Sequence, residues 1–189
     1  MRDLPMAEMM RYVAFLRGIN VGGNKLIKME ALAAAFASAG FRNVKTYIAS
    51  GNVIFDSRAT KIDGLEKKAE KKLLETFGHN IAVVIFSVAE LQALIESDVF
   101  KRITSHADAM LLVTFLKTNV KPAKLPIESK TENLKVFAMQ DRVAFTVALR
   151  KKTGWFGFPN NFIEKQLGVG ATTRQWRTLK KVVAVAERL

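Results

Sequence analysis

The chain has 189 residues, of which 49% are hydrophobic and 25% charged, as is ordinary for a globular protein with one good core or two small ones. It contains no cysteine, which excludes disulfides and thiolate chemistry. No apolar run approaches the roughly 20 residues that a membrane helix needs. The N-terminal MRDLPMAEMM carries acids among its apolar residues and makes a poor secretion signal, so we expect a cytoplasmic protein without a membrane partner.

The net charge of +13 is the one unusual global property. Lys and Arg outnumber Asp and Glu by 13 to 9 up to Ile95, and by 17 to 8 from Glu96 onward. A basic half attracts polyanions or phosphorylated ligands, and basic surfaces also serve solubility alone. The sequence leaves both interpretations open.

The first elements are a strand, a helix and a strand pair. Residues 11–18 are an apolar, β-rich run, and residues 29–37 carry a helical apolar stripe that ends at Gly40. Residues 43–57 predict two strands folded at 50–52, the Ser-Gly-Asn segment, where Gly and Asn favour positive φ.

A second helix and strand complete the first half. Residues 62–78 predict a helix ended by a glycine, residues 81–87 a strand, and Ser87 is placed to cap a further helix. The order is therefore β-α-β-β-α-β, that of the ferredoxin-like, split βαβ sandwich. We assign residues 10–100 to this unit.

The second half predicts a looser copy of the same order. Residues 110–117 resemble the first strand, and residues 134–149 resemble the strand pair, with a turn at Gln140-Asp141. Between them, residues 121–129 hold two prolines and allow only a short helix or an irregular crossover.

Two helices are predicted to end the chain, over residues 161–167 and 173–189, which gives β-(α)-β-β-α-α for residues 101–189. The join is expected near 100–107. The fold class predicted is α+β: two tandem ferredoxin-like α/β sandwich units, the second irregular with extra C-terminal helices.

The first candidate site is the loop RGINVGGNK, which connects a strand to a helix. Its spacing fits neither G-x-G-x-x-G nor the P-loop, so nucleotide fingerprints of those kinds are excluded. Consecutive glycines before a helix can form an anion-binding nest, and they are also what any tight turn would use. The candidate ligand-binding residues here are Arg17, Asn20, Gly22 and Gly23.

The second candidate is GVGATTRQW, residues 168–176, where Thr172 and Gln175 fit a capping box and predict the start of the last helix. Hydroxyls, free N–H groups and an arginine at a helix start suit a phosphate or carboxylate, whereas plain capping beside a solvated face is the alternative. With the hairpin, these segments add the candidate ligand-binding residues Ser50, Asn52, Thr172, Thr173 and Arg174.

The third candidate is the aromatic loop GWFGFPNNF, residues 154–162, which follows three basic residues. Its aromatic rings either stack on bases or fill a gap between sheet and helix. A basic stripe at Arg174, Arg177 and Lys181 is expected along the last helix. The candidate nucleic-acid-binding residues are Arg150, Lys151, Lys152, Arg177 and Lys181.

Catalytic groups are few. The two histidines, His79 and His106, have no spaced partners that would indicate a metal, and we expect no metal or cofactor. Ser50 and Thr173 are conceivable nucleophiles, but no general base accompanies them in the sequence.

Three stretches, RGINVGGNKLIKMEAL, GFRNVKTYIASGNVIFDS and NNFIEKQLGVGATTRQW, together resemble the bacterial family filed as domain of unknown function 1697. The resemblance implies a cytoplasmic α+β protein without an assigned activity. Gln175 stands where the family commonly has Asn. The positions that match the family's motifs are Arg17, Gly18, Asn20, Gly22, Gly23, Ser50, Gly51, Asn52, Thr172, Thr173, Arg174 and Trp176.

The leading hypothesis is an anionic ligand, a phosphate-bearing metabolite or a nucleic acid, bound where the Gly/Asn loop, the Ser-Gly-Asn hairpin and the Thr-Thr-Arg helix start meet. One alternative is an enzyme acting on a phosphorylated or carboxylated small molecule at the same place. Another is a protein-interaction module with no chemistry.

Overall fold

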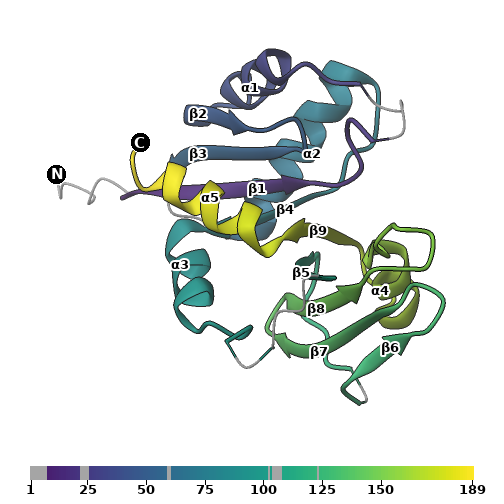
Figure 1. Ribbon diagram of the computed structural model, residues 1–189. Helices are drawn as coiled ribbons and strands as arrows, with labels where there is room; N and C mark the ends of the chain where they lie inside the picture. Colours follow the sequence, from purple (N-terminus) through teal and green to yellow (C-terminus); the bar gives the residue numbers. More distant parts are fainter. Residues whose placement is uncertain (1–7, 22–25, 59–60, 102, 104–107, 123) are drawn as a thin grey trace, which may run out of the picture. The chain divides into compact units, whose positions relative to one another are not determined.

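The computed structural model describes residues 8–21, 26–58, 61–101, 103, 108–122 and 124–189. Within them the fold is mixed α+β, with a four-stranded and a five-stranded antiparallel sheet and five helices (Figure 1). The chain divides into two compact units, one formed by Met1–Leu91 with Val185–Leu189 and the other by Gln92–Ala184. None of the described helices is long and apolar enough to span a bilayer.

The first unit has the element order predicted from the sequence. Its strands pair in the order β2-β3-β1-β4, and α3 follows β4 directly. The elements are β1 (Met9–Leu16), α1 (Met29–Ser38), β2 (Arg42–Tyr47), β3 (Asn52–Arg58), α2 (Ile62–Phe77), β4 (Val83–Ser87) and α3 (Val88–Glu96).

The core of this unit lies between the sheet and helices α1 and α2. Leu32 and Phe36 of α1 are buried in this core, as the helical stripe over residues 29–37 predicts, and so are Leu65 and Leu73 of α2. The Phe55 ring of β3 lies 5.7 Å from that of Phe36, centroid to centroid.

The second unit pairs its strands in the order β6-β7-β8-β5-β9. Without β6, the order β7-β8-β5-β9 repeats that of the first sheet, and again a helix follows the last strand directly (Figure 1). The elements are β5 (Ala109–Leu116), β6 (Ile127–Ser129), β7 (Leu134–Gln140), β8 (Val143–Leu149), α4 (Asn160–Leu167), β9 (Ala171–Gln175) and α5 (Trp176–Ala186).

Two predictions for the second unit are wrong. The segment 121–129, expected to be a short helix or irregular, contains strand β6. The segment 173–189 is not one helix: its start belongs to β9, and α5 begins only at Trp176. The β-branched Thr172 and Thr173 suit a strand, and pairing with β5 gives their backbone groups partners that a helix start leaves open.

Strand β4 is the last strand of its sheet, and glutamates of α2 close its outer edge. The Val83 N–H donates to Glu70 Oε1 at 2.8 Å and the Ile85 N–H donates to Glu66 Oε1 at 2.9 Å. Glu66 is buried, with 2% of its surface exposed. The helix therefore supplies the acceptors that a neighbouring strand would supply, which removes an edge prone to pairing with other chains.

The end of β4 is fixed by a capping box, as predicted for Ser87. The Ser87 N–H and hydroxyl both donate to Glu90 Oε2 at 2.7 Å, and the Glu90 N–H donates to Ser87 Oγ at 3.2 Å. Helix α3 therefore starts without an intervening loop.

Strand β9 is bound by α4 through one backbone and one side-chain hydrogen bond. The Ala171 N–H donates to Glu164 Oε1 at 2.9 Å, and the Thr173 hydroxyl donates to Asn160 Oδ1, at 2.6 Å. Asn160 and Glu164 stand four residues apart in α4, as Glu66 and Glu70 do in α2, so each pair lies on one helix face.

An ion pair joins β1 and β3 across the first sheet. Arg11 and Asp56 are directly opposite, and the guanidinium donates to both carboxylate oxygens, at 2.7 and 2.9 Å. Asn43 adds a third donor to Asp56 at 2.7 Å, and Arg11 also donates to the carbonyl of Ala186 at 2.8 Å. The pKa of Asp56 lies below its usual value, chiefly because Arg11 donates to the ionised form.

Replacing Glu66 tests the closure of β4. Glu66→Ala leaves the buried Ile85 N–H without its acceptor and should lower the free energy of unfolding by about 1–3 kcal/mol in a urea titration. Glu66→Gln keeps an acceptor oxygen and should be less destabilising. Glu75→Ala, on the exposed face of α2, is the control and should change little. Equal destabilisation by Glu66→Ala and Glu75→Ala would contradict the closure.

The Asp56 carboxylate gives a pH prediction. Because its pKa is lower folded than unfolded, its stabilisation is complete above about pH 4 and is lost as the pH falls through the lowered folded pKa. Asp56→Asn should therefore be less stable than wild type at pH 7, and the difference should shrink from about pH 4 downward. Urea unfolding at each pH measures this, with Asp63→Asn, on the surface pair with Lys67, as the control. A constant difference at all pH values would contradict it.

Candidate functional site

The first predicted loop and the hairpin meet in the first unit through Asn20. Its Nδ2 donates to the carbonyls of Ile27 and Ala49, both at 3.0 Å, and its Oδ1 accepts the Ile27 N–H at 2.7 Å. Asn20 has φ 55°, a conformation that asparagine tolerates. Its amide therefore holds the loop against the hairpin. Arg17 is half-buried just before it, and Gly22 and Gly23 lie outside the described residues.

The hairpin turn is built differently from the prediction. Gly51 has positive φ, 74°, as expected, but the second such residue is Ile48, at 50°, and Asn52 is the first residue of β3. Asn52 is fully buried, and its Nδ2 donates to the Tyr47 carbonyl and to Ser50 Oγ, both at 3.0 Å. The Asn52 amide thus stabilises the turn from inside, while Ser50 is exposed.

The predicted Thr-Thr-Arg helix start is wrong, because these residues lie in the middle of β9. Successive strand residues face opposite sides of a sheet, so Thr173 points away from Thr172 and Arg174. The Thr173 hydroxyl lies 2.7 Å from that of Thr114 on β5, and it donates to Asn160, as described above; all three residues are buried. This row of polar groups belongs to the interior.

Arg174 is a buried cation. It is 8% exposed, and its Nη1 donates to Thr172 Oγ1 at 2.9 Å and to the Thr173 carbonyl at 2.8 Å. Burial lowers the pKa of Arg174 to about 10, so the guanidinium stays charged at neutral pH. It is not the exposed helix-start cation that the sequence predicted. The predicted meeting of this segment with the first loop stays a prediction.

A pocket of about 410 Å³ lies at one end of the second sheet, where β5 begins and β8 and β9 end. It brings together Arg150 and Arg177, which the sequence placed on separate elements. Besides the first residues of β5, the pocket is lined by Arg150, Phe156, Gln175, Trp176, Arg177 and Lys180, and we call it the basic–aromatic pocket.

Arg150 is held in place at the rim of this pocket. Its Nε donates to Asp108 Oδ1 and its Nη1 to the Gly154 carbonyl, both at 3.0 Å. Its guanidinium carbon lies 4.8 Å from the centre of the Phe156 ring, in cation–π contact. The loop after β8 is therefore folded back onto the guanidinium.

The other two cations come from the beginning of α5. Because α5 follows β9 without a loop, Arg177 lies beside the end of the strand, and its Nε donates to Gln175 Oε1 at 2.6 Å. Lys180 lies one turn further on the same face, and both are exposed. No acid lies in the first turn of α5, so these charges add to the positive end of the helix dipole.

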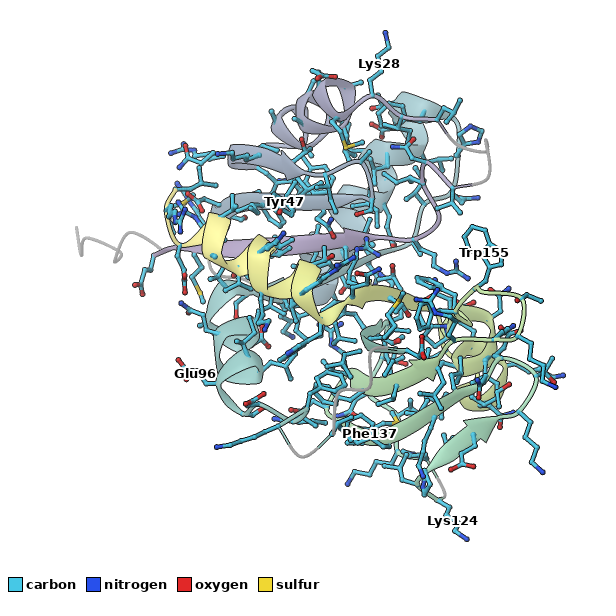
Figure 2. All side chains as sticks on the ribbon, in the orientation of Figure 1. Lys28, Tyr47, Glu96, Lys124, Phe137 and Trp155 are labelled. Atoms are coloured by element: carbon cyan, nitrogen blue, oxygen red, sulfur yellow. The ribbon has the colours of Figure 1, made fainter. Side chains whose placement is uncertain are left out.

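Some rings of the aromatic loop are packed in the interior and others are exposed. Phe156 and Phe162 pack against the buried Leu112, Leu134 and Ala148. Trp155 is 77% exposed and extends from the loop (Figure 2), and Phe158 is 53% exposed. An exposed ring is available for stacking on a base.

The remaining predicted basic residues lie outside the pocket lining. Lys151 donates to Glu132 Oε2 at 2.8 Å, and Lys152 and Lys181 are exposed. Lys180 was missed because the predicted stripe was counted from Arg174, whereas the helix begins at Trp176. Within the described residues, no group of three or more His, Cys, Asp or Glu side chains is placed to hold a metal ion.

A family model described as protein of unknown function (DUF1697) matches residues 9–145. The chain belongs to this family. The match includes the first two stretches that carried the resemblance and ends before the third.

The fold also matches a solved structure, the conserved bacterial protein SP0830 from Streptococcus pneumoniae, with a TM-score of 0.62 and 19% identity. The alignment covers 95% of this chain and 99% of that one. At this identity the likeness concerns the fold alone. No curated protein gives a significant match.

Replacing Asn20 distinguishes a structural amide from a ligand-binding one. Asn20→Ala removes three hydrogen bonds and should lower the free energy of unfolding by about 1–3 kcal/mol, measured in urea without any ligand. Asn20→Gly relieves the positive φ but does not restore the hydrogen bonds, so it should recover only part of that free energy. Asn119→Ala, an exposed amide, is the control. An Asn20→Ala variant as stable as wild type would contradict this role.

Proposed function

We propose that the protein binds a phosphate-bearing ligand with a planar base, a nucleotide or a single-stranded nucleic acid, at the basic–aromatic pocket. The observation that carries the proposal is the convergence of Arg150, Arg177 and Lys180 on a pocket that also contains Phe156 and Trp176. This pocket replaces the Thr-Thr-Arg helix start as the candidate anion site, because Thr173 and Arg174 are buried in β9.

The chemistry of the pocket suits the two parts of such a ligand. Guanidinium groups bind phosphate oxygens through two parallel hydrogen bonds, and Lys180 adds a point charge. The exposed Trp155, five residues from Arg150, offers a ring on which a base can stack. A volume of about 410 Å³ lies within the usual range for small-ligand sites.

The repeated strand order supports a further inference about the fold. The orders β2-β3-β1-β4 and β7-β8-β5-β9, each with a helix before the last strand, fit two tandem ferredoxin-like units. In the second unit β6 occupies the place of the first helix in the chain order. A cytoplasmic location, where nucleotides and nucleic acids are abundant, is part of the proposal.

The test is a binding titration with a labelled single-stranded oligonucleotide and with a free mononucleotide at several salt concentrations. Arg177→Gln with Lys180→Gln should weaken oligonucleotide binding and flatten its salt dependence by about 0.7 in slope for each phosphate that the variant no longer neutralises. Trp155→Ala should weaken binding by about 5- to 100-fold at an unchanged slope, because stacking carries no charge.

The matched control is Lys121→Gln with Lys124→Gln, which removes the same charge from the same unit. Lys124 is well separated from Trp155 (Figure 2) and lines a different pocket. If both double variants weakened oligonucleotide binding equally, the basic residues would attract the ligand only non-specifically, and the proposed site would be wrong. Binding of neither probe at low salt would overturn the function. Tight binding of the mononucleotide would identify a nucleotide site, and binding of the oligonucleotide alone a single-strand surface.

A further inference from the structure

The first unit has a basic pocket that lies outside the candidate sites predicted from the sequence and outside the proposed function. It has a volume of about 430 Å³ and lies where β1 begins, β3 ends and β2 begins, beside the first turns of α2. Its charged lining residues are Arg42, Arg58 and Lys68, which come from β2, β3 and α2. Among the described residues, no carboxylate lines the pocket, and Ser57 adds a hydroxyl.

Among the described residues, these three cations differ from their neighbours in having no acidic partner. On the same helix, Lys67 pairs with Asp63 and Lys72 with Glu75, both at 2.8 Å. Within the part of the chain that the structure describes, Arg42, Arg58 and Lys68 form no ion pair. Three like charges around one cavity repel each other, and an anion bound between them would offset that repulsion.

The cations are placed on regular elements. Arg42 on β2 lies opposite Asp56 on β3. Since Asp56 is two residues before Arg58, both arginines lie near the end of β3. The Lys68 ammonium lies 5.2 Å from the centre of the Phe41 ring, and this cation–π contact fixes its position.

Two glycines line the pocket. Gly40 has φ 84°, and a Cβ there would lie 3.4 Å from Lys68 Nζ. Gly64, in the first turn of α2, also lines the pocket without a side chain. The start of α2, the positive end of its dipole, therefore lines the same pocket as the three cations.

We infer that this pocket of the first unit is a separate binding site for a phosphate group, held by Arg42, Arg58 and Lys68. It lies in the unit that does not contain the basic–aromatic pocket, so the chain would have two separate phosphate-binding sites. The ligand class is a phosphate monoester or polyphosphate, because two guanidinium groups and one ammonium match a group with several anionic oxygens.

The experiment is a titration with inorganic phosphate and with pyrophosphate, followed by the amide NMR signals of Gly40 and Gly64. It uses the full chain carrying Arg177→Gln and Lys180→Gln, so that binding at the other pocket is weakened. Saturable shifts of both signals are expected, with pyrophosphate binding more tightly. Adding Arg42→Gln and Arg58→Gln should weaken binding by about tenfold or more, and adding Lys68→Gln alone should also weaken it.

The control adds Lys45→Gln and Lys71→Gln, two exposed lysines of the same unit outside the pocket, and should change the affinity by no more than about twofold. Shifts that rise linearly without saturation, or equal weakening by the control, would overturn the inference. Absence of the shifts in the Arg177→Gln, Lys180→Gln background itself would also overturn it, while leaving the proposed function standing.

Discussion

Both sheets depend on one constraint, the closure of their last strand by the helix that precedes it in the chain. Glu66 and Glu70 accept backbone N–H groups of β4, and Glu164 accepts one of β9. Asn160, whose position in α4 corresponds to that of Glu66 in α2, accepts a hydrogen bond from the Thr173 side chain on β9. A buried carboxylate is costly unless several donors satisfy it, so its use here indicates that an open strand edge would be worse. The same solution in both units fits a duplicated origin.

This closure also fixes the candidate site. Because no loop separates β9 from α5, the direction of the strand decides where the first turn of the helix lies. Arg177 and Lys180 therefore lie at the end of the sheet where β8 ends. At the same end, Arg150 pairs with Phe156 of the loop that follows β8. The pocket thus depends on the pairing of β9 with β5 and on the direct passage from β9 into α5, and not on a motif within one segment.

The sequence predicted what depends on local spacing. The element order of the first unit follows from periodicity and the cap from the residue type of Ser87, and both are confirmed. Strand β9 was missed because Ala171–Gln175 fits both a strand and a capping box, and the free edge of the distant β5 decides between them. The sequence identified Asn20 and Asn52 as residues with a specific polar role. Their side-chain amides bind backbone carbonyls instead of facing a ligand, and only the surrounding backbone determines this.

The placement of charge separates solubility from binding. A basic surface kept for solubility would spread its cations among acids, as along α2, where Lys67 and Lys72 each have a carboxylate partner. At the start of α5 the opposite holds: Arg177 occupies a first turn with no acid, where the helix dipole disfavours a cation. Such a placement costs stability in the free protein, and an anion in the neighbouring pocket would offset that cost. Within the candidate pocket this argument applies to Arg177 and Lys180, whereas Arg150 is already paired with Asp108.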